Sequence, residues 1–292
     1  MASPYYSVDL HTHTCHSDGM DTPTQLVAKA AHQGIRSLAV TDHDTVDAIA
    51  EARQAGALHG IEVLTGIELS VQYQQYDDIH LLAYGFDPTF APLGAHLARL
   101  QEGRVQRGLE ILQRINVLLT RRGQAPLEST QVLQQAQGVL TRPHLAQVLL
   151  EHGYSSTVQN AFRDFLIPCN VPKAALSPEE ALAVINQAGG ICALAHPGAL
   201  SGDQQDLHGL LGALKAMGMV GVEVYHRQHY PDAIAFFQAC AVRYGLIATG
   251  GSDYHGRPNG ATLGEIAPGY VIPEQTLYEL RRALARQQRE SS

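Results

Sequence analysis

Two histidines near the start of the chain stand two residues apart in a stretch that alternates apolar and polar side chains. Residues 8–13 read Val-Asp-Leu-His-Thr-His, an alternation that predicts a β-strand. Because side chains on a strand alternate between its faces, we expect His11 and His13 to emerge on one side as a first pair of metal ligands. A polar loop with Asp18 follows. Taken alone, this pattern fits a chance surface pair as well as a metal site.

Further residues of metal-binding type follow at or near the ends of the later predicted strands. In parallel α/β barrels these strand ends converge on one face, where the site is built. The nitrogen and oxygen donors, with no thiolate, suit Mn²⁺, Zn²⁺ or Fe²⁺. They exceed what one ion needs, so two or three ions are expected. Nine residues are predicted ligands: His11, His13, Asp18, His43, Glu68, His80, His196, Asp253 and His255.

The elements that must position these residues alternate along most of the chain, which is typical of parallel βα units. Strands are predicted at 8–13, 37–40, 61–65, 79–84, 191–195, 221–225 and 246–249. Helices are predicted at 24–33, 46–59, 177–188, 206–217, 231–244 and 274–288. We therefore expect an α/β barrel.

The alternation stops between residues 89 and 168. Apolar residues recur there every three or four positions over 93–119, which predicts a long helix, and shorter helices are predicted at 129–137, 143–151 and 157–166. We interpret 89–168 as an inserted, all-helical cap domain, and 1–88 with 169–292 as the metal-binding barrel. A set of long surface excursions is the alternative interpretation.

Composition narrows the classes of function. The 292 residues carry a formal net charge of −8 with 15 neutral histidines, which argues against a protein that coats polyanions. The four cysteines have no CxxC spacing and are expected as reduced thiols. We find no export signal and no membrane-length apolar run, so a cytoplasmic location without membrane association is expected.

Taken together, the motifs resemble those of the polymerase and histidinol phosphatase (PHP) family. The resemblance rests on His11-x-His13 with Asp18, Thr41-Asp42-His43, Gly66-Ile67-Glu68, His196-Pro197 and Ser252-Asp253-x-His255. It implies a distorted (β/α)₇ barrel that binds three divalent ions and hydrolyses phosphate esters. Among the possible ions, Mn²⁺ is the first expectation. One ion would be held by His11, His13, Glu68 and Asp253. A second would be held by Glu68, His80 and His196, and the third by Asp18, His43 and His255.

Within the family, the chain is similar to nucleoside 3′,5′-bisphosphate phosphatases. The helical insertion, Thr141-Arg142-Pro143-His144 and Glu223-Val224-Tyr225-His226 carry this similarity. The implied substrate is a small nucleotide with two phosphates, and no stable protein partner is evident. Hydrolysis of short 5′-phosphorylated RNA or DNA from the 5′ end is the nearest alternative, and a histidinol-phosphate-type phosphatase is another. A metal-binding regulatory module is the non-enzymatic alternative.

Several residues outside the ligand set are expected to contact the substrate. Arg142 precedes a helix that opens at Pro143, so its guanidinium and the helix N-terminus would both face a second phosphate. His226 and Arg227 end a strand and face the same opening, where His226 would protonate the leaving oxygen. Arg104 and Arg107 lie on the insertion and would close over a nucleotide.

Overall fold

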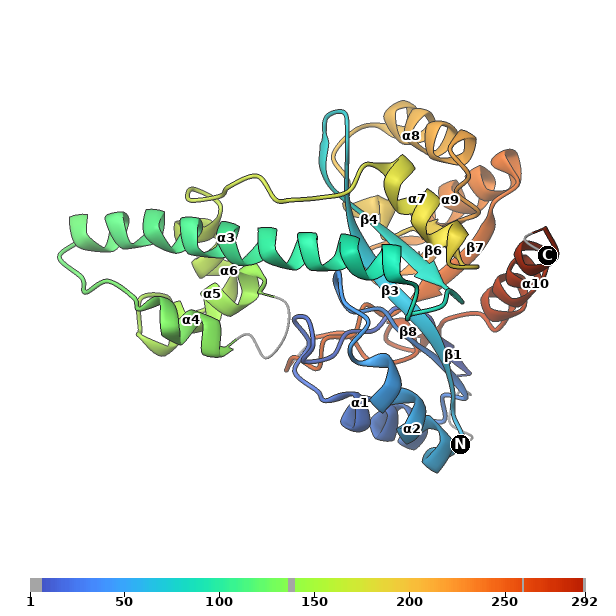
Figure 1. The fold of residues 1–292 in the computed structure, drawn as a ribbon, viewed down its shortest axis with the longest axis horizontal. Coiled ribbons are helices and arrows are strands. Elements are labelled where there is room, and N and C mark those ends of the chain that lie inside the picture. Colours follow the sequence, from blue (N-terminus) through green and yellow to red (C-terminus); the bar gives the residue numbers. More distant parts are fainter. Residues whose placement is uncertain (1–6, 136–139, 259, 291–292) are drawn as a thin grey trace.

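The computed structural model describes residues 7–135, 140–258 and 260–290. Seven strands form one sheet in sequential order, β1 to β7, with an elongated helical insertion projecting from it (Figure 1). The Leu10 N–H donates to the Gly250 carbonyl oxygen over 3.3 Å, which brings β7 back to the start of the sheet. The sheet is thus a nearly closed barrel, as predicted. Its strands are β1 (Val8–Asp9), β2 (Ser37–Val40), β3 (Glu62–Tyr73), β4 (Tyr76–Tyr84), β5 (Ile191–Leu194), β6 (Gly221–His226) and β7 (Ile247–Gly251).

The expectation of parallel βα units throughout is wrong at β4. Strand β3 continues past its predicted end at residue 65 to Tyr73. After a connection of two residues, β4 begins at Tyr76 and runs antiparallel to β3. A two-residue connection leaves no room for a crossover helix, so the pair forms a hairpin. Strand β5 is likewise antiparallel to β4. Glu68 therefore lies within a long strand rather than in a loop after a short one.

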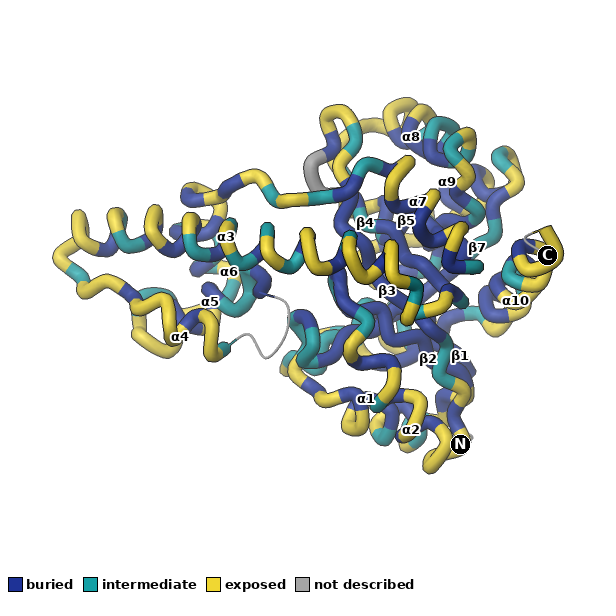
Figure 2. Tube along the Cα trace, viewed as in Figure 1, coloured by how far each residue is buried: buried dark blue, intermediate teal, exposed yellow. Residues whose placement is uncertain are grey.

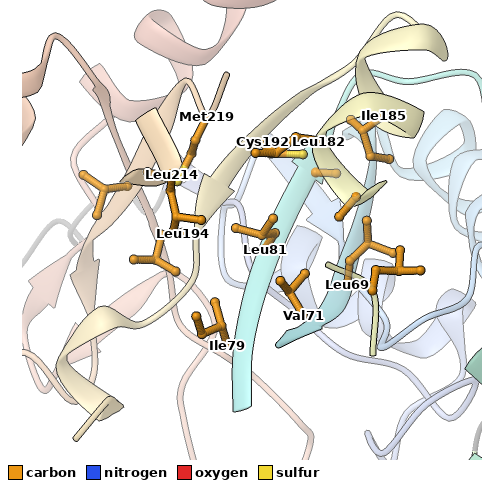
Figure 3. Packing of buried hydrophobic residues seen from close by; sticks show 14 of the residues in the cluster. Leu69, Val71, Ile79, Leu81, Leu182, Ile185, Cys192, Leu194, Leu214 and Met219 are labelled. Carbon is orange, nitrogen blue, oxygen red and sulfur yellow. The ribbon is translucent and has the colours of Figure 1, made fainter. Parts of the chain in front are cut away.

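Helices cover the barrel, and local sequence signals explain where they begin and end. The capping boxes at Thr22 and Ser177 open α1 and α7, each with proline in the first turn, and Gly60 ends α2 in the left-handed conformation. Apolar side chains of β3, β4 and β5 pack beneath α7 and α8 (Figure 3). These helices are α1 (Pro23–His32), α2 (Ile49–His59), α7 (Pro178–Gln187), α8 (Gln204–Ala216), α9 (Pro231–Tyr244) and α10 (Gln275–Glu290).

The insertion begins with α3 (Ala91–Arg121), a continuous helix of 31 residues that spans roughly 46 Å at 1.5 Å per residue. Its first half packs into the barrel core through Leu93, Leu97 and Leu100. Its second half belongs to a separate core that extends from Ile111 to Val171. Figure 2 shows buried segments facing one another inside this outlying part. The antiparallel β4 explains the length of α3, because β4 ends at the barrel end opposite to that of its parallel neighbours.

Shorter elements complete the insertion and the chain. The insertion also contains α4 (Ser129–Gln135), α5 (Arg142–Glu151), α6 (Val158–Ala161) and the π-helical turn η1 (Phe162–Leu166). The last two residues of the predicted helix 129–137 lie outside the described residues. A small hairpin of β8 (Glu265–Ala267) and β9 (Tyr270–Val271) was not predicted. None of the helices in the described ranges has the length and apolar character needed to cross a bilayer.

Candidate metal centre

His11 and His13 meet at the end of the barrel where β1 and β2 finish. Their Nε2 atoms are 3.1 Å apart, and each lies 3.2 Å from Oε2 of Glu68. Oδ1 of Asp253 completes the group, 3.2 Å from His13 Nε2 and 3.5 Å from His11 Nε2. Strand β1 is only two residues long, yet the two imidazoles converge as expected. Four donor atoms thus surround one point, the arrangement expected for the first ion.

The second carboxylate oxygen of Glu68 faces a different pair of imidazoles. Oε1 lies 2.9 Å from His80 Nδ1 and 2.9 Å from His196 Nε2. The two nitrogen atoms are 3.4 Å apart. Glu68 therefore presents one oxygen to each of two donor groups, which is the geometry that a bridging carboxylate needs.

A third group forms around Asp18. Its Oδ1 lies 3.1 Å from His255 Nε2 and 3.9 Å from His43 Nε2. His43 Nδ1 is in turn 3.2 Å from Glu68 Oε2, so this group adjoins the other two. Across the described residues, clusters with ligand atoms within 4.8 Å of one another include all nine predicted ligands: His11, His13, Asp18, His43, Glu68, His80, His196, Asp253 and His255.

The backbone around the cluster takes conformations that are unfavourable for ordinary residues. His196 has φ of 27° and Asp253 has φ of 55°, both in the left-handed region. Such strain costs of the order of 1–3 kcal/mol per residue and persists only where the surroundings impose it. A Cβ on Gly251 would lie 2.1 Å from the Cβ of His11. Only glycine therefore lets β7 approach β1 closely enough to bring Asp253 to His11.

The charges of the cluster fit cation binding. Burial opposes ionisation of Glu68, but His43 and His80 outweigh it and hold its pKa well below the usual range. Burial lowers the pKa of His13, yet Asp253 and Glu68 reverse this and raise it to about 10. A proton on His13 thus offsets carboxylate charge where a cation would do so, whereas burial lowers the pKa of His43 to about 3 and leaves that ring neutral. Metal binding must displace such protons and therefore strengthens as pH rises.

Buried polar atoms without hydrogen-bond partners in the cluster also indicate cation binding. Within the described residues, Asp18 Oδ1 and His43 Nδ1 are buried without a well-formed hydrogen bond. Buried polar atoms in native proteins are normally bonded, so such a concentration needs an explanation. Divalent cations satisfy lone pairs of this kind, and the donor set fits them.

Glu223 belongs to the motif Glu223-Val224-Tyr225-His226, but the sequence analysis gave it no role in the site. It lies on β6, fully buried, with Oε1 3.0 Å from His11 Nδ1. Its Oε2 accepts a hydrogen bond of 2.7 Å from the backbone N–H of His196. The carboxylate thus orients the His11 imidazole, as carboxylates behind metal-bound histidines commonly do, and fixes the backbone at His196. Its signal was an acidic residue in the apolar strand Gly-Val-Glu-Val-Tyr.

Arg104 connects the insertion to the barrel. Its side chain is only 8% exposed and forms an ion pair with the fully buried Asp44. Its Nη2 also donates to Ser70 Oγ over 2.8 Å, and Lys173, on the segment that returns from the insertion, lies 3.4 Å from the same oxygen. Asp44 follows the ligand His43. The pair therefore links α3 to the loop that carries a metal ligand.

The other predicted substrate residues are spread over the cap and the barrel. Arg107 donates to the carbonyl oxygen of Val171 over 2.6 Å. Arg142 lies over the ring of Phe162, 5.7 Å from its centroid. Arg227 is exposed at the end of β6.

His226 is fully buried beside the metal ligands. Its Nδ1 accepts a hydrogen bond of 3.2 Å from the Gln228 N–H. Its Nε2 therefore carries the proton of the neutral ring. That nitrogen lies 3.6 Å from Oδ2 of Asp253.

Comparison with known proteins identifies the family of the chain. The PHP domain family matches residues 9–161. The chain is 32% identical over 261 residues to the 3′,5′-nucleoside bisphosphate phosphatase of Chromobacterium violaceum, covering 85% of this chain and 87% of that protein. It is 34% identical over 264 residues to the 5′-3′ exoribonuclease Rnm of Escherichia coli, covering 87% and 88%.

Two further relatives are similar over most of the chain. The phosphoribosyl 1,2-cyclic phosphate 1,2-diphosphodiesterase of Eggerthella lenta is 33% identical over 254 residues, covering 85% of this chain and 94% of that protein. A crystal structure from Bifidobacterium adolescentis, assigned as a metal-dependent phosphoesterase, superposes with a TM-score of 0.81 at 30% identity and 96% coverage of both chains. With its barrel and its convergent donors, the chain belongs to the PHP domain family of metal-dependent phosphoesterases.

Proposed function

We propose that the protein is a phosphomonoesterase that hydrolyses nucleoside 3′,5′-bisphosphates, such as adenosine 3′,5′-bisphosphate, to the 5′-monophosphate and phosphate. The activity of the C. violaceum relative supports this substrate. The observation that carries the proposal is the position of α5 on the insertion. Its first turn lies close enough to the third donor group for Asp18 and Arg257 to influence the pKa of His144.

The first turn of α5 has the properties of a phosphate site. The Thr141 N–H donates to His144 Nδ1 over 3.1 Å, so the neutral ring keeps its proton on Nε2. Burial lowers the pKa of His144 and keeps the ring a neutral donor. Arg142 opens the same helix, whose N-terminal dipole favours an anion. We assign the 5′-phosphate to Arg142 and this turn, and the 3′-phosphate to the metal centre.

We further propose that three divalent ions occupy the three donor groups, and that Mn²⁺ is the ion to test first. The first group is His11, His13, Glu68 and Asp253; the second is Glu68, His80 and His196; the third is Asp18, His43 and His255. When bound, such ions lower the pKa of water and offset charge on a phosphoryl group. The donors here are all imidazole and carboxylate, which Mn²⁺, Zn²⁺ and Fe²⁺ accept.

The remaining residues act on the substrate or on its surroundings. His226 is proposed to donate its Nε2 proton to the leaving 3′-oxygen, and Arg227 to contact the phosphate at the same opening. Arg104 and Arg107 are bonded to Asp44 and Val171, so we assign them the role of holding the cap over the barrel. The separate core from Ile111 to Val171 supports treating 89–168 as that cap. A cytoplasmic location stays a prediction.

Turnover of adenosine 3′,5′-bisphosphate in Mn²⁺ tests the proposal. We expect release of one phosphate per molecule with 5′-AMP as the nucleotide product, and loss of activity after chelation. Histidinol phosphate, which lacks a second phosphate, is expected to be a poor substrate. Retained metal without turnover of any phosphate ester would instead support a regulatory metal-binding module.

Exonuclease activity on short 5′-phosphorylated RNA or DNA is the second candidate. The similarity to the 5′-3′ exoribonuclease of E. coli favours it. The same centre serves both reactions, because a 3′-phosphate and the first internucleotide phosphate are equally distant from a 5′-phosphate. Comparing the two substrates on one preparation distinguishes the candidates: the phosphatase proposal requires the mononucleotide to be turned over much faster.

A further inference from the structure

A buried histidine outside the ligand set, His229, lies behind the turn that carries the ligand His196. It follows the end of β6 by three residues, and only 5% of it is exposed. Its ring packs against the ring of Phe237 on α9, with the two centroids 4.8 Å apart. A ring enclosed in this way is not accessible to a substrate, so its role depends on what its two nitrogen atoms hold.

The partners of the His229 ring determine which nitrogen carries the proton. Nδ1 lies 2.8 Å from the backbone carbonyl oxygen of Val224, which can only accept, so Nδ1 is the donor. Nε2 accepts a hydrogen bond of 3.0 Å from the backbone N–H of Gly198. Burial lowers the pKa of His229 to about 4, so the ring is neutral near pH 7 and keeps the Nε2 lone pair that the Gly198 N–H requires.

The turn that His229 holds is the one in which the backbone of His196 is strained. His196 has φ of 27°, and such a conformation persists only where the surroundings impose it. The backbone N–H of His196 donates to Glu223, and that of Gly198 donates to His229. Pro197 between them has no N–H. Side chains from β6 and from the loop after it therefore fix the turn on both sides of Pro197.

The ring and the turn are in direct contact. A Cβ on Gly198 would lie 2.5 Å from Cδ2 of His229 and 2.8 Å from its Nε2, so the ring can approach this closely only because the residue is glycine. Two residues earlier, Nε2 of His196 lies 2.9 Å from Oε1 of Glu68 in the second donor group. A shift of Gly198 away from His229 would therefore move a proposed metal ligand.

We propose that His229 is a positioning residue of the metal centre: together with Glu223, it holds the turn of residues 196–198 so that Nε2 of His196 faces the second donor group. The inference rests on the proposed binding of divalent ions. A ligand that is already in place needs no rearrangement when the ion binds. Loss of the hydrogen bond from Gly198 should therefore weaken the second ion most, and residues behind metal-bound histidines typically change metal affinity about 10- to 100-fold.

Two substitutions of similar size separate the hydrogen bond from packing. His229→Leu removes the acceptor for the Gly198 N–H and should weaken the binding of one Mn²⁺ ion about tenfold or more, measured by titration against a competing chelator. His229→Gln can offer an amide oxygen to the same N–H and should recover part of the loss. Activity of His229→Leu should fall at limiting Mn²⁺ and return in excess Mn²⁺, which a role in folding alone would not produce.

Leu210→Ala is the control for general destabilisation. Leu210 is a buried residue of α8, 3% exposed, and its truncation leaves a cavity that lowers the free energy of unfolding. The contact between His229 and Gly198 is unchanged in this variant. We therefore expect every Mn²⁺ ion to bind Leu210→Ala with wild-type affinity.

Gly198→Ala and an NMR measurement test the same contact without replacing the histidine. The added methyl group would push the turn away from the ring, so the affinity for one Mn²⁺ ion should again fall about tenfold or more. In the metal-free wild-type protein, ¹⁵N NMR should show His229 with its proton on Nδ1. A proton on Nε2 would overturn the inference, because such a ring cannot accept a hydrogen bond from Gly198.

The outcomes separate this inference from the proposed function. If the wild-type protein binds Mn²⁺ and both His229→Leu and Gly198→Ala bind it equally well, His229 serves folding alone and the inference fails while the metal centre stands. Equal weakening of Mn²⁺ binding in Leu210→Ala and His229→Leu has the same meaning. If the wild-type protein binds no divalent ion, the proposed metal centre fails first, and the inference fails with it.

Discussion

In the barrel, buried polar side chains gather at one end and face one another, whereas the insertion buries almost only apolar ones. The described residues of 89–168 include only Arg104 and Thr141 as buried polar residues, and their core is built from leucine, isoleucine, valine and phenylalanine. The barrel end concentrates nine potential ligands. The difference indicates that the barrel supplies the chemistry, while the insertion is a rigid support that presents a few residues to it.

The largest effect is expected from removing the bridging carboxylate. Metal coordination contributes several kcal/mol of transition-state stabilisation, so Glu68→Gln should lower kcat/KM by on the order of a thousandfold, at tenfold per 1.4 kcal/mol. Glu62→Gln on the same strand, where the carboxylate is 44% exposed, should change little. Atomic-absorption analysis should show fewer bound ions in Glu68→Gln alone. Full metal content with full activity would show that the convergent donors are not a metal centre.

Breaking the link between the two regions should produce the next largest effect. Arg104→Met leaves the buried Asp44 carboxylate without its partner, which should cost about 3–5 kcal/mol in the free energy of unfolding. Arg99→Met on the same helix is the matched control, because its ion pair with Glu180 is exposed and worth about 0–1 kcal/mol. Urea denaturation measures both. Equal destabilisation by the two variants would mean that Asp44 does not depend on Arg104.

Substitution of Glu223 tests whether the metal ligands need the carboxylate that contacts His11 and His196. Glu223→Ala should weaken metal affinity about 10- to 100-fold, as for other residues that orient metal-bound histidines. Glu223→Gln keeps one oxygen for the His196 N–H and should recover part of the loss. Titration with Mn²⁺ under competition from a chelator gives the affinities. Wild-type affinity in Glu223→Ala would assign the carboxylate to folding alone.

The smallest effect is expected on the cap. Arg142→Ala should raise KM for adenosine 3′,5′-bisphosphate about tenfold, because a charge-assisted hydrogen bond is worth about 1.5–3 kcal/mol. KM for 3′-AMP, which lacks the 5′-phosphate, should change much less. Arg163→Ala, an exposed cap residue paired with Asp164, is the control. An equal rise for both substrates would remove the assignment of the 5′-phosphate to Arg142.

The sequence by itself determined the barrel and the set of potential ligands. Alternating apolar strands and helix caps are local signals, and donors such as His43 and His196 follow their strands directly. The structure brings those donors together because parallel strands end on one face. The position of Glu68 in a long strand was missed, since a hairpin depends on the pairing of β3 with β4, which no local pattern reveals.

Only the tertiary structure decided what lies behind and around those ligands. Glu223 looks like an isolated acid in an apolar strand until β6 places it against His11. From the sequence, Arg104 was predicted to close over a nucleotide, but α3 crosses the barrel and buries it beside Asp44. A pocket next to His80 and His196 joins residues more than a hundred positions apart in the chain. Such contacts depend on packing between distant segments, and periodicity along one segment carries no information about its partner.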